Sequence, residues 1–388
     1  QMVTMSCWHP DIIEYIEAKK TPGRLSKFNM SVLCTDEFML AIKMDRSWQL
    51  VFPNYEQYPS EYKANWNGDL ATWMSLIGSE DSVVVYHKFE SARDLWDLIM
   101  ENTYNRNEPG VLFVDHMNQM NNLHYCEWIN ATNPCGEQVL PIGGVCLLGS
   151  LNLVHFIDTD KKDWKYKELK TIIHTAIRFM DNVNDKTNVP LKSQKDNLKN
   201  KRRIGLGVLG YGSSLLMARV KYGSSKALEL TENLMKFFTN EAYKASALLA
   251  KEKGSFPIYD KEQYLQGEFI KRLDRSTLNL IKERGMRNSH VTSIQPTGNS
   301  SCFANLVSGG LEPLFMHGYV RTSIQPNAPE GLVIPKNIDW KNKSFDLENV
   351  EDNEVNWNWI KEGDEDLLAT QFENKTWKFD RTRGLLKE

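Results

Sequence analysis

The chain has 388 residues, of which 41% are hydrophobic and 25% are charged, and its formal net charge is −3. A chain of this kind can bury a large core, as one large domain or as two or three smaller ones. Its Lys and Arg residues are scattered, so nucleic-acid binding is not expected. No N-terminal signal pattern and no apolar run near the ~18 residues of a membrane span is visible, so we expect no membrane insertion.

The six cysteines occupy positions 7, 34, 126, 135, 146 and 302. They are too few for a disulfide scaffold, and no CxxC pair suggests zinc, so a reducing cytoplasm is expected. Cys7, Cys34, Cys126 and Cys302 have apolar or aromatic neighbours and are predicted to be small core residues. The histidines lack the spacing of iron or zinc ligands, so no metal site is predicted.

The first elements alternate between strand and helix. Residues 1–5 are predicted to be a strand, and residues 11–18 a helix that starts after Pro10. A second helix is predicted after Ser91, with Leu95, Leu98 and Ile99 as its buried stripe. Residues 111–114 are predicted to be a buried strand.

Two longer helices follow. Apolar residues from Leu169 to Val183 keep a period of 3.6, and a second such pattern runs from Leu230 to Leu249 with Gly254 as its C-cap. Helices of this length between short strands predict a mixed α/β core with largely parallel strands. The stretch from residue 323 onward is rich in polar residues and proline and is predicted to form surface loops and short elements.

The most informative motif is Asn133-Pro134-Cys135-Gly136-Glu137, with Cys146 shortly after it. In an extended segment, Asn133, Cys135 and Glu137 would face the same side and could converge on one ligand. A thiol can become a thiyl radical, a carboxylate can take a hydroxyl proton, and an amide can hold a second hydroxyl. Cys146 could then supply reducing electrons by forming a disulfide. The alternative is an ordinary turn with a buried cysteine.

The surrounding sequence resembles the large, catalytic subunit of ribonucleotide reductase. In that family an Asn-x-Cys-x-Glu loop precedes a strand with Cys-x-Leu-Gly-Ser-x-Asn-Leu, as residues 146–153 do here. Further segments look like family segments in family order: residues 9–12, 28–32, 108–113, 203–208 and 296–301. The resemblance implies an α/β fold with a ten-stranded α/β barrel, incomplete in this chain, and an active-site finger loop inside the barrel.

The resemblance also implies roles for individual residues. Cys135 matches the thiyl radical that removes the ribose 3′ hydrogen, Glu137 the base at the 3′ hydroxyl, and Asn133 the amide that binds substrate hydroxyls. Cys146 matches one of two cysteines that reduce the 2′ position. Asn29 and Ser31 match a segment close to the active site. A substrate-phosphate loop is implied by six consecutive residues: Pro296, Thr297, Gly298, Asn299, Ser300 and Ser301.

Two glycine-containing motifs need separate interpretation. Taken alone, residues 296–301 could be an ordinary turn and helix cap, whereas exposed N–H groups ahead of a helix suit an anion. Residues 205–210 fit GxGxxG, but the polar residues 200–203 before them are not the strand that a dinucleotide fold needs. The family resemblance implies that these glycines, and residues 308–313, are packing positions.

The implied activity is that of a ribonucleoside-diphosphate reductase linked to thioredoxin or glutaredoxin, making deoxyribonucleotides for DNA synthesis. The implied partners are a ribonucleoside di- or triphosphate, ATP or dNTP effectors, and a second copy in a homodimer. We expect no cofactor held by this chain alone. The radical would come either from a metal-containing small subunit, as in class I enzymes, or from adenosylcobalamin, as in class II. Both stay open, with class I favoured for a split large subunit.

Several family parts have no match here, including the first redox cysteine, most of the effector-reading loops and the C-terminal tail. We therefore expect a central fragment that needs a complementary fragment for turnover. Residues 1–322 would be a partial catalytic barrel domain, and residues 323–388 surface elements leading to further barrel elements. The alternative is a non-catalytic nucleotide-binding or assembly remnant of the same fold.

Overall fold

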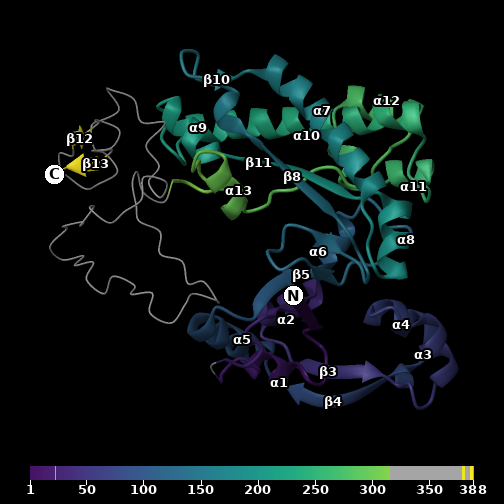
Figure 1. Cartoon of the computed structure of the whole chain (residues 1–388). Coiled ribbons are helices and arrows are strands. Elements are labelled where there is room, and N and C mark those ends of the chain that lie inside the picture. Colours follow the sequence, from purple (N-terminus) through teal and green to yellow (C-terminus); the bar gives the residue numbers. More distant parts are fainter. Residues whose placement is uncertain (22, 315–377, 381–384, 388) are drawn as a thin grey trace. The chain divides into compact units, whose positions relative to one another are not determined.

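The structure is a computed structural model that describes residues 1–21, 23–314, 378–380 and 385–387. Its chain contacts divide it into two compact units. The first comprises Gln1–Gly149, Ile173–Leu206 and Phe238–Ser293, and the second Ser150–Ile172, Gly207–Phe237 and Ile294–Glu388. Helices and strands alternate along the chain (Figure 1), so the mixed α/β class is confirmed.

The first unit begins with a parallel three-stranded sheet. Its strands are β1 (Met2–Ser6), β2 (Asn29–Cys34) and β5 (Gly110–Phe113), in the order β1-β2-β5. Helices α1 (Ile12–Glu17), α2 (Asp36–Met44) and α5 (Ala92–Arg106) accompany this sheet. The predicted strand at the N-terminus and both predicted helices are therefore confirmed.

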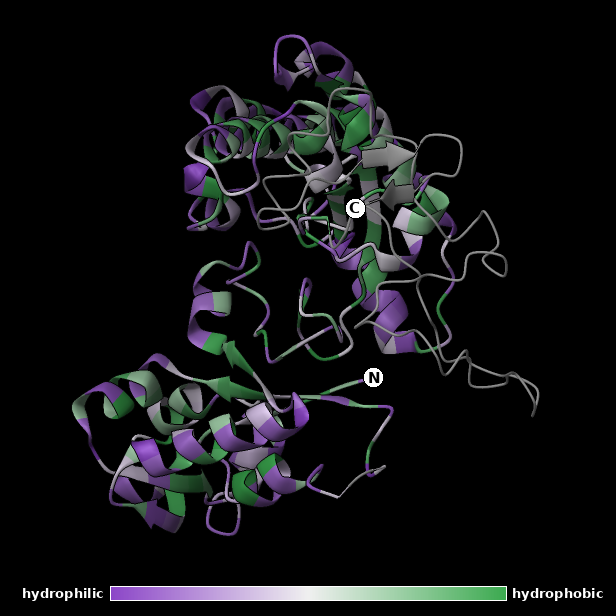
Figure 2. Cartoon of the chain, turned by 90° about the vertical axis from the view of Figure 1, so that its left-hand side faces the viewer, coloured by the Kyte–Doolittle hydropathy of each residue, from purple (hydrophilic) through white to green (hydrophobic). Residues whose placement is uncertain are grey.

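One face of this sheet shares a core with those helices. Cys7, Val32 and Cys34 are fully buried together with Ile12 of α1 and Phe38 of α2. Alternation along a strand puts Thr4, Ser6 and Leu33 on the opposite face. In Figure 2 hydrophobic and hydrophilic residues alternate along the helices, as expected for helices that bury one face and expose the other.

An antiparallel pair of strands comes between α2 and α5 in the sequence. Strand β3 (Trp48–Pro53) pairs with β4 (Val83–Phe89), and helices α3 (Pro59–Asn65) and α4 (Leu70–Ile77) with the short η1 (Glu80–Ser82) connect them. Aromatic rings of Phe52, Tyr62, Trp66 and Trp73 fill the space between the strands and the two helices.

The prediction of largely parallel strands was wrong for most described pairs. Besides β3–β4, three pairs are antiparallel: β6 (Ala131–Thr132) with β7 (Val139–Leu140), β9 (Ile157–Asp158) with β10 (Asp163–Trp164), and β12 (Lys378–Asp380) with β13 (Leu385–Lys387). The connections from β6 to β7 and from β9 to β10 are only a few residues long. A connection of this length can join antiparallel strands, whereas parallel strands need a long crossover. The strand β5 is also less buried than predicted, since the Phe113 side chain is exposed.

Long helices supply much of the remaining core. The predicted helices from Leu169 and Leu230 are confirmed within α7 (Tyr166–Lys186) and α10 (Ser225–Lys253). Gly254 ends α10 as expected, with φ +82° and its N–H donating to the Ala250 carbonyl at 2.9 Å. The other elements of the chain up to residue 303 are α6 (Val114–Gln119), β8 (Leu147–Asn152), η2 (Leu153–His155), α8 (Lys192–Lys201), β11 (Ile204–Leu209), α9 (Tyr211–Met217), α11 (Lys261–Leu265), η3 (Ile270–Arg272), α12 (Arg275–Arg284) and α13 (Gly298–Phe303).

A buried carboxylate ties several of these elements together. Asp181 of α7 is fully buried and accepts hydrogen bonds from Arg202 at 2.6 Å, Lys253 at 3.1 Å and Arg287 at 3.2 Å. Burial alone would raise its pKa, but the hydrogen bonds and charges of Arg202, Lys253 and Arg287 together lower it. Removing one partner of such a network leaves a buried charge uncompensated.

The largest sheet among the described residues has three strands, and these residues form no closed barrel. The ten-stranded barrel therefore stays a proposal. The predicted division at residue 322 lies outside the described residues, as do residues 323–377, 381–384 and 388 of the expected surface segment.

Candidate active site

The motif around Cys135 is a tight turn that joins β6 to β7. Its Gly136 N–H donates to the Asn133 carbonyl at 3.0 Å, and the Asn133 N–H donates to the Gln138 carbonyl at 3.1 Å. Asn at the first position, Pro at the second and Gly at the fourth are the residues that such a turn favours. Gly136 has φ +84°, a value that a residue with a Cβ rarely adopts. The sequence thus builds the turn, and Cys135 becomes its third residue.

The prediction of an extended segment was therefore wrong. Gly136 reverses the chain, so alternation no longer puts Asn133, Cys135 and Glu137 on one side. The amide oxygen of Asn133 accepts the Gln138 N–H at 3.0 Å and so holds the loop itself. Its Nδ2 group remains the part of the amide that can donate to a ligand. The two interpretations of the motif, turn and active site, are compatible.

Cys135 and Glu137 differ in exposure. Cys135 is a free, exposed thiol near the apex of the turn. Glu137 is half-buried, and its Oε2 atom is buried with no hydrogen-bond partner among the described residues. Buried acceptors are normally paired, so this oxygen is available to accept a proton or a hydrogen bond. Asn29 lies beside the turn, because its Nδ2 donates to the Pro134 carbonyl at 3.4 Å.

Cys146 lies just before β8 and within electrostatic reach of Glu137. Burial raises the pKa of its thiol to about 12, the charge of Arg203 opposes this shift, and the charge of Glu137 adds to it. A thiol with this pKa stays protonated at neutral pH. Of the predicted site residues, Glu137 is thus the one whose charge acts on the Cys146 thiol.

A buried cluster behind these residues was missed by the sequence interpretation. Arg203 is 1% exposed, pairs with Glu127 and donates its Nε–H to His290 Nδ1 at 3.2 Å. Its Nη1 atom has no partner among the described residues. Lys201 also binds Glu127, at 2.6 Å. The only sequence signal for this cluster is the polar run at residues 200–203, before the GxGxxG motif.

Close packing explains the first glycine of that motif. A Cβ at Gly205 would lie 2.5 Å from Nε2 of Gln138, 2.7 Å from Cβ of Ser293 and 2.8 Å from Cδ2 of Leu148. Contacts this short require glycine, so its interpretation as a packing residue is confirmed. Strand β11 therefore packs tightly against the end of the Cys135 loop.

Residues 296–301 belong to the second unit. Thr297 has φ +52°, and its hydroxyl accepts the Gly310 N–H at 2.8 Å. Gly298, Asn299 and Ser300 are exposed at the start of α13, and the Ser301 N–H is already bonded to the Thr297 carbonyl at 2.8 Å. The first N–H groups of a helix have no intrahelical partner and can bind an anion.

Residues 308–313 pack against this loop and against α9. Gly309 approaches the Pro296 carbonyl so closely that a Cβ would lie 2.7 Å from it. Ser308 and Ser213 exchange two hydrogen bonds, of 2.9 and 3.1 Å. The packing role predicted for residues 308–313 is confirmed for these contacts.

The remaining cysteines divide into two groups. Cys7 and Cys34 are buried core residues, as predicted. Cys126 and Cys302 are exposed, so their prediction as core residues was wrong: apolar neighbours in sequence do not fix which way a loop or short-helix side chain points.

Across the described part of the chain, no three His, Cys, Asp or Glu side chains gather as a metal ligand set, and no helix could span a membrane.

A family model described as "Ribonucleotide reductase, barrel domain" matches residues 1–358. The chain belongs to this family. Among similar proteins, the "Vitamin B12-dependent ribonucleoside-diphosphate reductase" of Thermoplasma acidophilum is 33% identical, over 81% of this chain and 35% of the relative.

Two further relatives show how widely the similarity extends. The protein of the same name from Mycobacterium tuberculosis is 29% identical, over 83% of this chain and 40% of the relative. The "Ribonucleoside-diphosphate reductase subunit alpha" of Chlamydia pneumoniae is 28% identical, over 83% of this chain and 33% of the relative. The chain thus spans 33% to 40% of the length of these relatives.

Proposed function

We propose that this chain carries the reaction centre of a ribonucleotide reductase and reduces the ribose of a ribonucleotide by radical chemistry. The observation that carries the proposal is the loop at residues 133–137, with its exposed Cys135 thiol, the unpartnered Glu137 carboxylate oxygen and Cys146 nearby. Family membership and the names of the relatives support the same reaction.

The first half of the proposed reaction uses the loop residues. Cys135, as a thiyl radical, takes the hydrogen atom from the ribose 3′ carbon, while Glu137 accepts the proton of the 3′ hydroxyl. An oxygen with no other partner is suited to accept this proton. The Asn133 Nδ2 group donates to a substrate hydroxyl and orients the sugar.

The second half removes the 2′ hydroxyl as water. Cys146 donates the proton to this leaving group, and its raised pKa keeps that proton in place at neutral pH. A second thiol gives a hydrogen atom to the 2′ carbon and joins Cys146 in a disulfide, and the remaining electron reduces the 3′ position as Glu137 returns its proton to the 3′ oxygen. We propose that this second thiol comes from another segment of the whole enzyme, as the family resemblance implies. Cys135 finally recovers its radical by returning a hydrogen atom to the 3′ carbon.

The substrate phosphates are proposed to bind at residues 296–301. Gly298, Asn299 and Ser300 are exposed residues at the start of α13, where the first N–H groups of a helix suit an anion. Pro296 shapes the entry to the loop. The Thr297 hydroxyl accepts the Gly310 N–H at 2.8 Å, and the Ser301 hydroxyl donates to the Gly298 carbonyl at 2.9 Å, so both stabilise the loop. The whole-protein expectations stay within this proposal: a barrel around the finger loop, a homodimer, nucleotide effectors, and reduction by thioredoxin or glutaredoxin.

The radical source is proposed to meet the chain at Cys135. Its exposed thiol would be oxidised by one electron, either by adenosylcobalamin or by a metal-containing small subunit whose radical is relayed through a pair of C-terminal tyrosines. The T. acidophilum and M. tuberculosis relatives carry the B12-dependent name, whereas the C. pneumoniae relative is named as an alpha subunit. Adding each source separately to the activity assay distinguishes them.

The test combines this chain with the complementary segments of a relative, a dithiol reductant and a radical source, and measures deoxyribonucleotide formation. We expect activity that falls by at least about a hundredfold in Cys135→Ser. Cys126→Ser, which removes another exposed thiol of the same unit, should leave activity unchanged. Retained activity in Cys135→Ser, or nucleotide binding without turnover under every condition, contradicts the proposal and favours a non-catalytic remnant.

A further inference from the structure

A cavity of 370 Å³ lies in the first unit, apart from the residues of the proposed reaction. It opens where the parallel strands end: Ser6 closes β1, Thr35 follows β2, and Asp115 follows β5 shortly after its last residue. Ligands of α/β proteins bind preferentially at the carboxyl ends of parallel strands, in pockets of roughly 300–1,000 Å³. Position and size both fit a small-molecule site.

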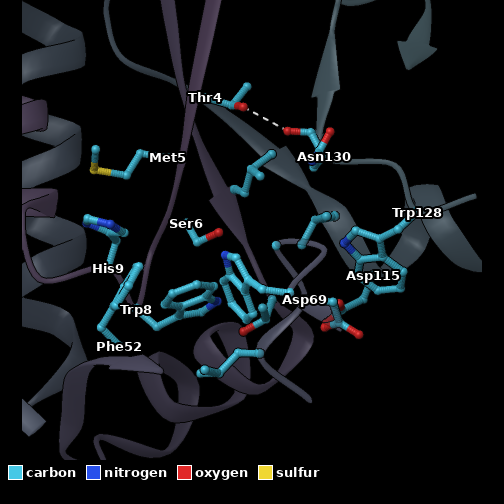
Figure 3. A pocket seen from close by; sticks show the side chains of 16 residues that line it. Thr4, Met5, Ser6, Trp8, His9, Phe52, Asp69, Asp115, Trp128 and Asn130 are labelled. Atoms are coloured by element: carbon cyan, nitrogen blue, oxygen red, sulfur yellow. Dashed lines mark hydrogen bonds between the residues drawn. The ribbon is translucent and has the colours of Figure 1, made fainter. Parts of the chain in front are cut away.

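Aromatic rings form much of the wall. Trp8, Phe52, Trp66 and Trp128 line the cavity, and the rings of Trp8 and Trp66 meet edge to face at 6.2 Å. Figure 3 shows Trp8 and Trp128 on different sides of the space, with Asp69 between them and Asp115 beside Trp128. Indole faces attract flat rings and cations.

The charge of the lining is negative. Asp69 and Asp115 contribute carboxylates, and none of the lining residues is Lys or Arg. Both acids are held in place, because Asp69 caps helix α4 and Asp115 Oδ2 accepts the Asp36 N–H at 2.7 Å. A carboxylate has about four acceptor sites, so each acid keeps capacity for a ligand. Burial lowers the pKa of His9, which therefore does not offset these charges at neutral pH.

One polar atom of the lining lacks a partner. The side-chain oxygen of Asn130 is buried without a hydrogen bond among the described residues, although the Asn130 main-chain oxygen accepts from Thr4 at 2.7 Å. An unpaired buried acceptor is unfavourable, so a ligand that brings N–H donors would be stabilised here.

We propose that this cavity binds a planar aromatic cation, a flat ring that bears an amidinium-type or ammonium-type nitrogen. The ring lies against the indoles, and the cationic N–H groups donate to Asp115 and Asp69. Such a site is independent of ribonucleotide reduction and uses none of the residues assigned to it.

The experiment is calorimetric titration of the full chain with three probes of one shape: benzamidine, benzamide and benzoate. They place a positive, a neutral and a negative group on the same ring. We expect benzamidine to bind at least about tenfold more tightly than benzamide, and benzoate not to bind. Asp115→Asn should remove most of this preference, since asparagine keeps the acceptor for Asp36 without the charge. Trp128→Leu should weaken benzamidine and benzamide alike.

The matched control is Asp97→Asn, which removes the same charge from an exposed position on α5. It should leave all three affinities unchanged, and circular dichroism should confirm that each variant is folded. Equal binding of the three probes would show that the cavity binds the ring without selecting for positive charge, and this result would overturn the proposal. Absence of benzamidine binding, or an unchanged preference in Asp115→Asn, overturns it as well.

Discussion

Cys135 and Cys146 are two thiols in opposite environments. Cys135 is exposed at a turn that Pro134 and Gly136 shape, whereas Cys146 is half-buried beside the charges of Glu137 and Arg203. An exposed sulfur can meet a radical donor, and a thiol held in its protonated form can deliver a proton. The different environments match the two roles proposed for these residues.

The charge of Glu137 should be measurable at Cys146. Because this charge helps to raise the pKa of the thiol, Glu137→Gln should lower that pKa and increase the thiolate fraction. Alkylation of Cys146 by iodoacetamide at pH 9 should then become about two- to threefold faster, since one pKa unit is a tenfold change in thiolate. Peptide mass spectrometry gives the rate at each cysteine.

Glu268→Gln is the control for this measurement, because Glu268 is exposed and pairs with Lys271 in the same unit. It should not change the rate at Cys146, and the exposed Cys126 should react alike in all three proteins. A slower or unchanged rate at Cys146 in Glu137→Gln would show that the two side chains do not interact as described.

At the scale of elements, strand β11 fixes the position of the loop that follows Cys135. Gly205 allows Gln138, Ser293 and Leu148 to approach the strand backbone more closely than any side chain would permit. Gly205→Ala should therefore destabilise the protein by about 1–3 kcal/mol, because a methyl group there forces its neighbours to move. Urea unfolding followed by circular dichroism measures the change.

Gly149→Ala is the matched control in the neighbouring strand β8. Its nearest neighbour is the flexible side chain of Met180, with Sδ at 3.0 Å, so a smaller cost is expected. Equal stabilities of Gly205→Ala and the unsubstituted protein would contradict the close packing.

The elements also show what the sequence could and could not predict. Periodicity located α1, α5, α7 and α10, because each buries one continuous apolar stripe. Strand direction was predicted poorly, since the pairing of β3 with β4 depends on a tertiary arrangement that alternation does not encode.

At the site, the Asn-Pro-Cys-Gly order is sufficient to predict the turn that the structure shows, whereas alternation predicts an extended segment. The Arg203–His290 contact joins residues far apart in the chain, so the polar run that contains Arg203 gives no indication of its partner.

At the scale of the whole molecule, buried polar groups rather than surface pairs should set the response to acid. His290 lies next to Arg203, which only donates hydrogen bonds, so its Nδ1 must accept and the proton must sit on Nε2, facing the Asn121 amide oxygen at 3.1 Å. Burial, together with the charges of Arg203 and Lys201, lowers the pKa of His290 well below its usual value. The half-buried imidazole is therefore held in its neutral form.

This arrangement predicts that the protein loses stability in mild acid. The unfolded histidine binds a proton near pH 6.5 while the folded one does not, so stability is present above that pH and falls as the pH drops below it. The slope contributed by His290 should reach about 1.4 kcal/mol per pH unit. His290→Gln keeps a donor and an acceptor but cannot titrate, so its unfolding free energy should fall less steeply between pH 7 and pH 5. His87→Gln, at an exposed position on β4, should keep the original slope. If His290→Gln and the unsubstituted protein show parallel pH profiles in denaturant titrations, His290 is not held in its neutral form.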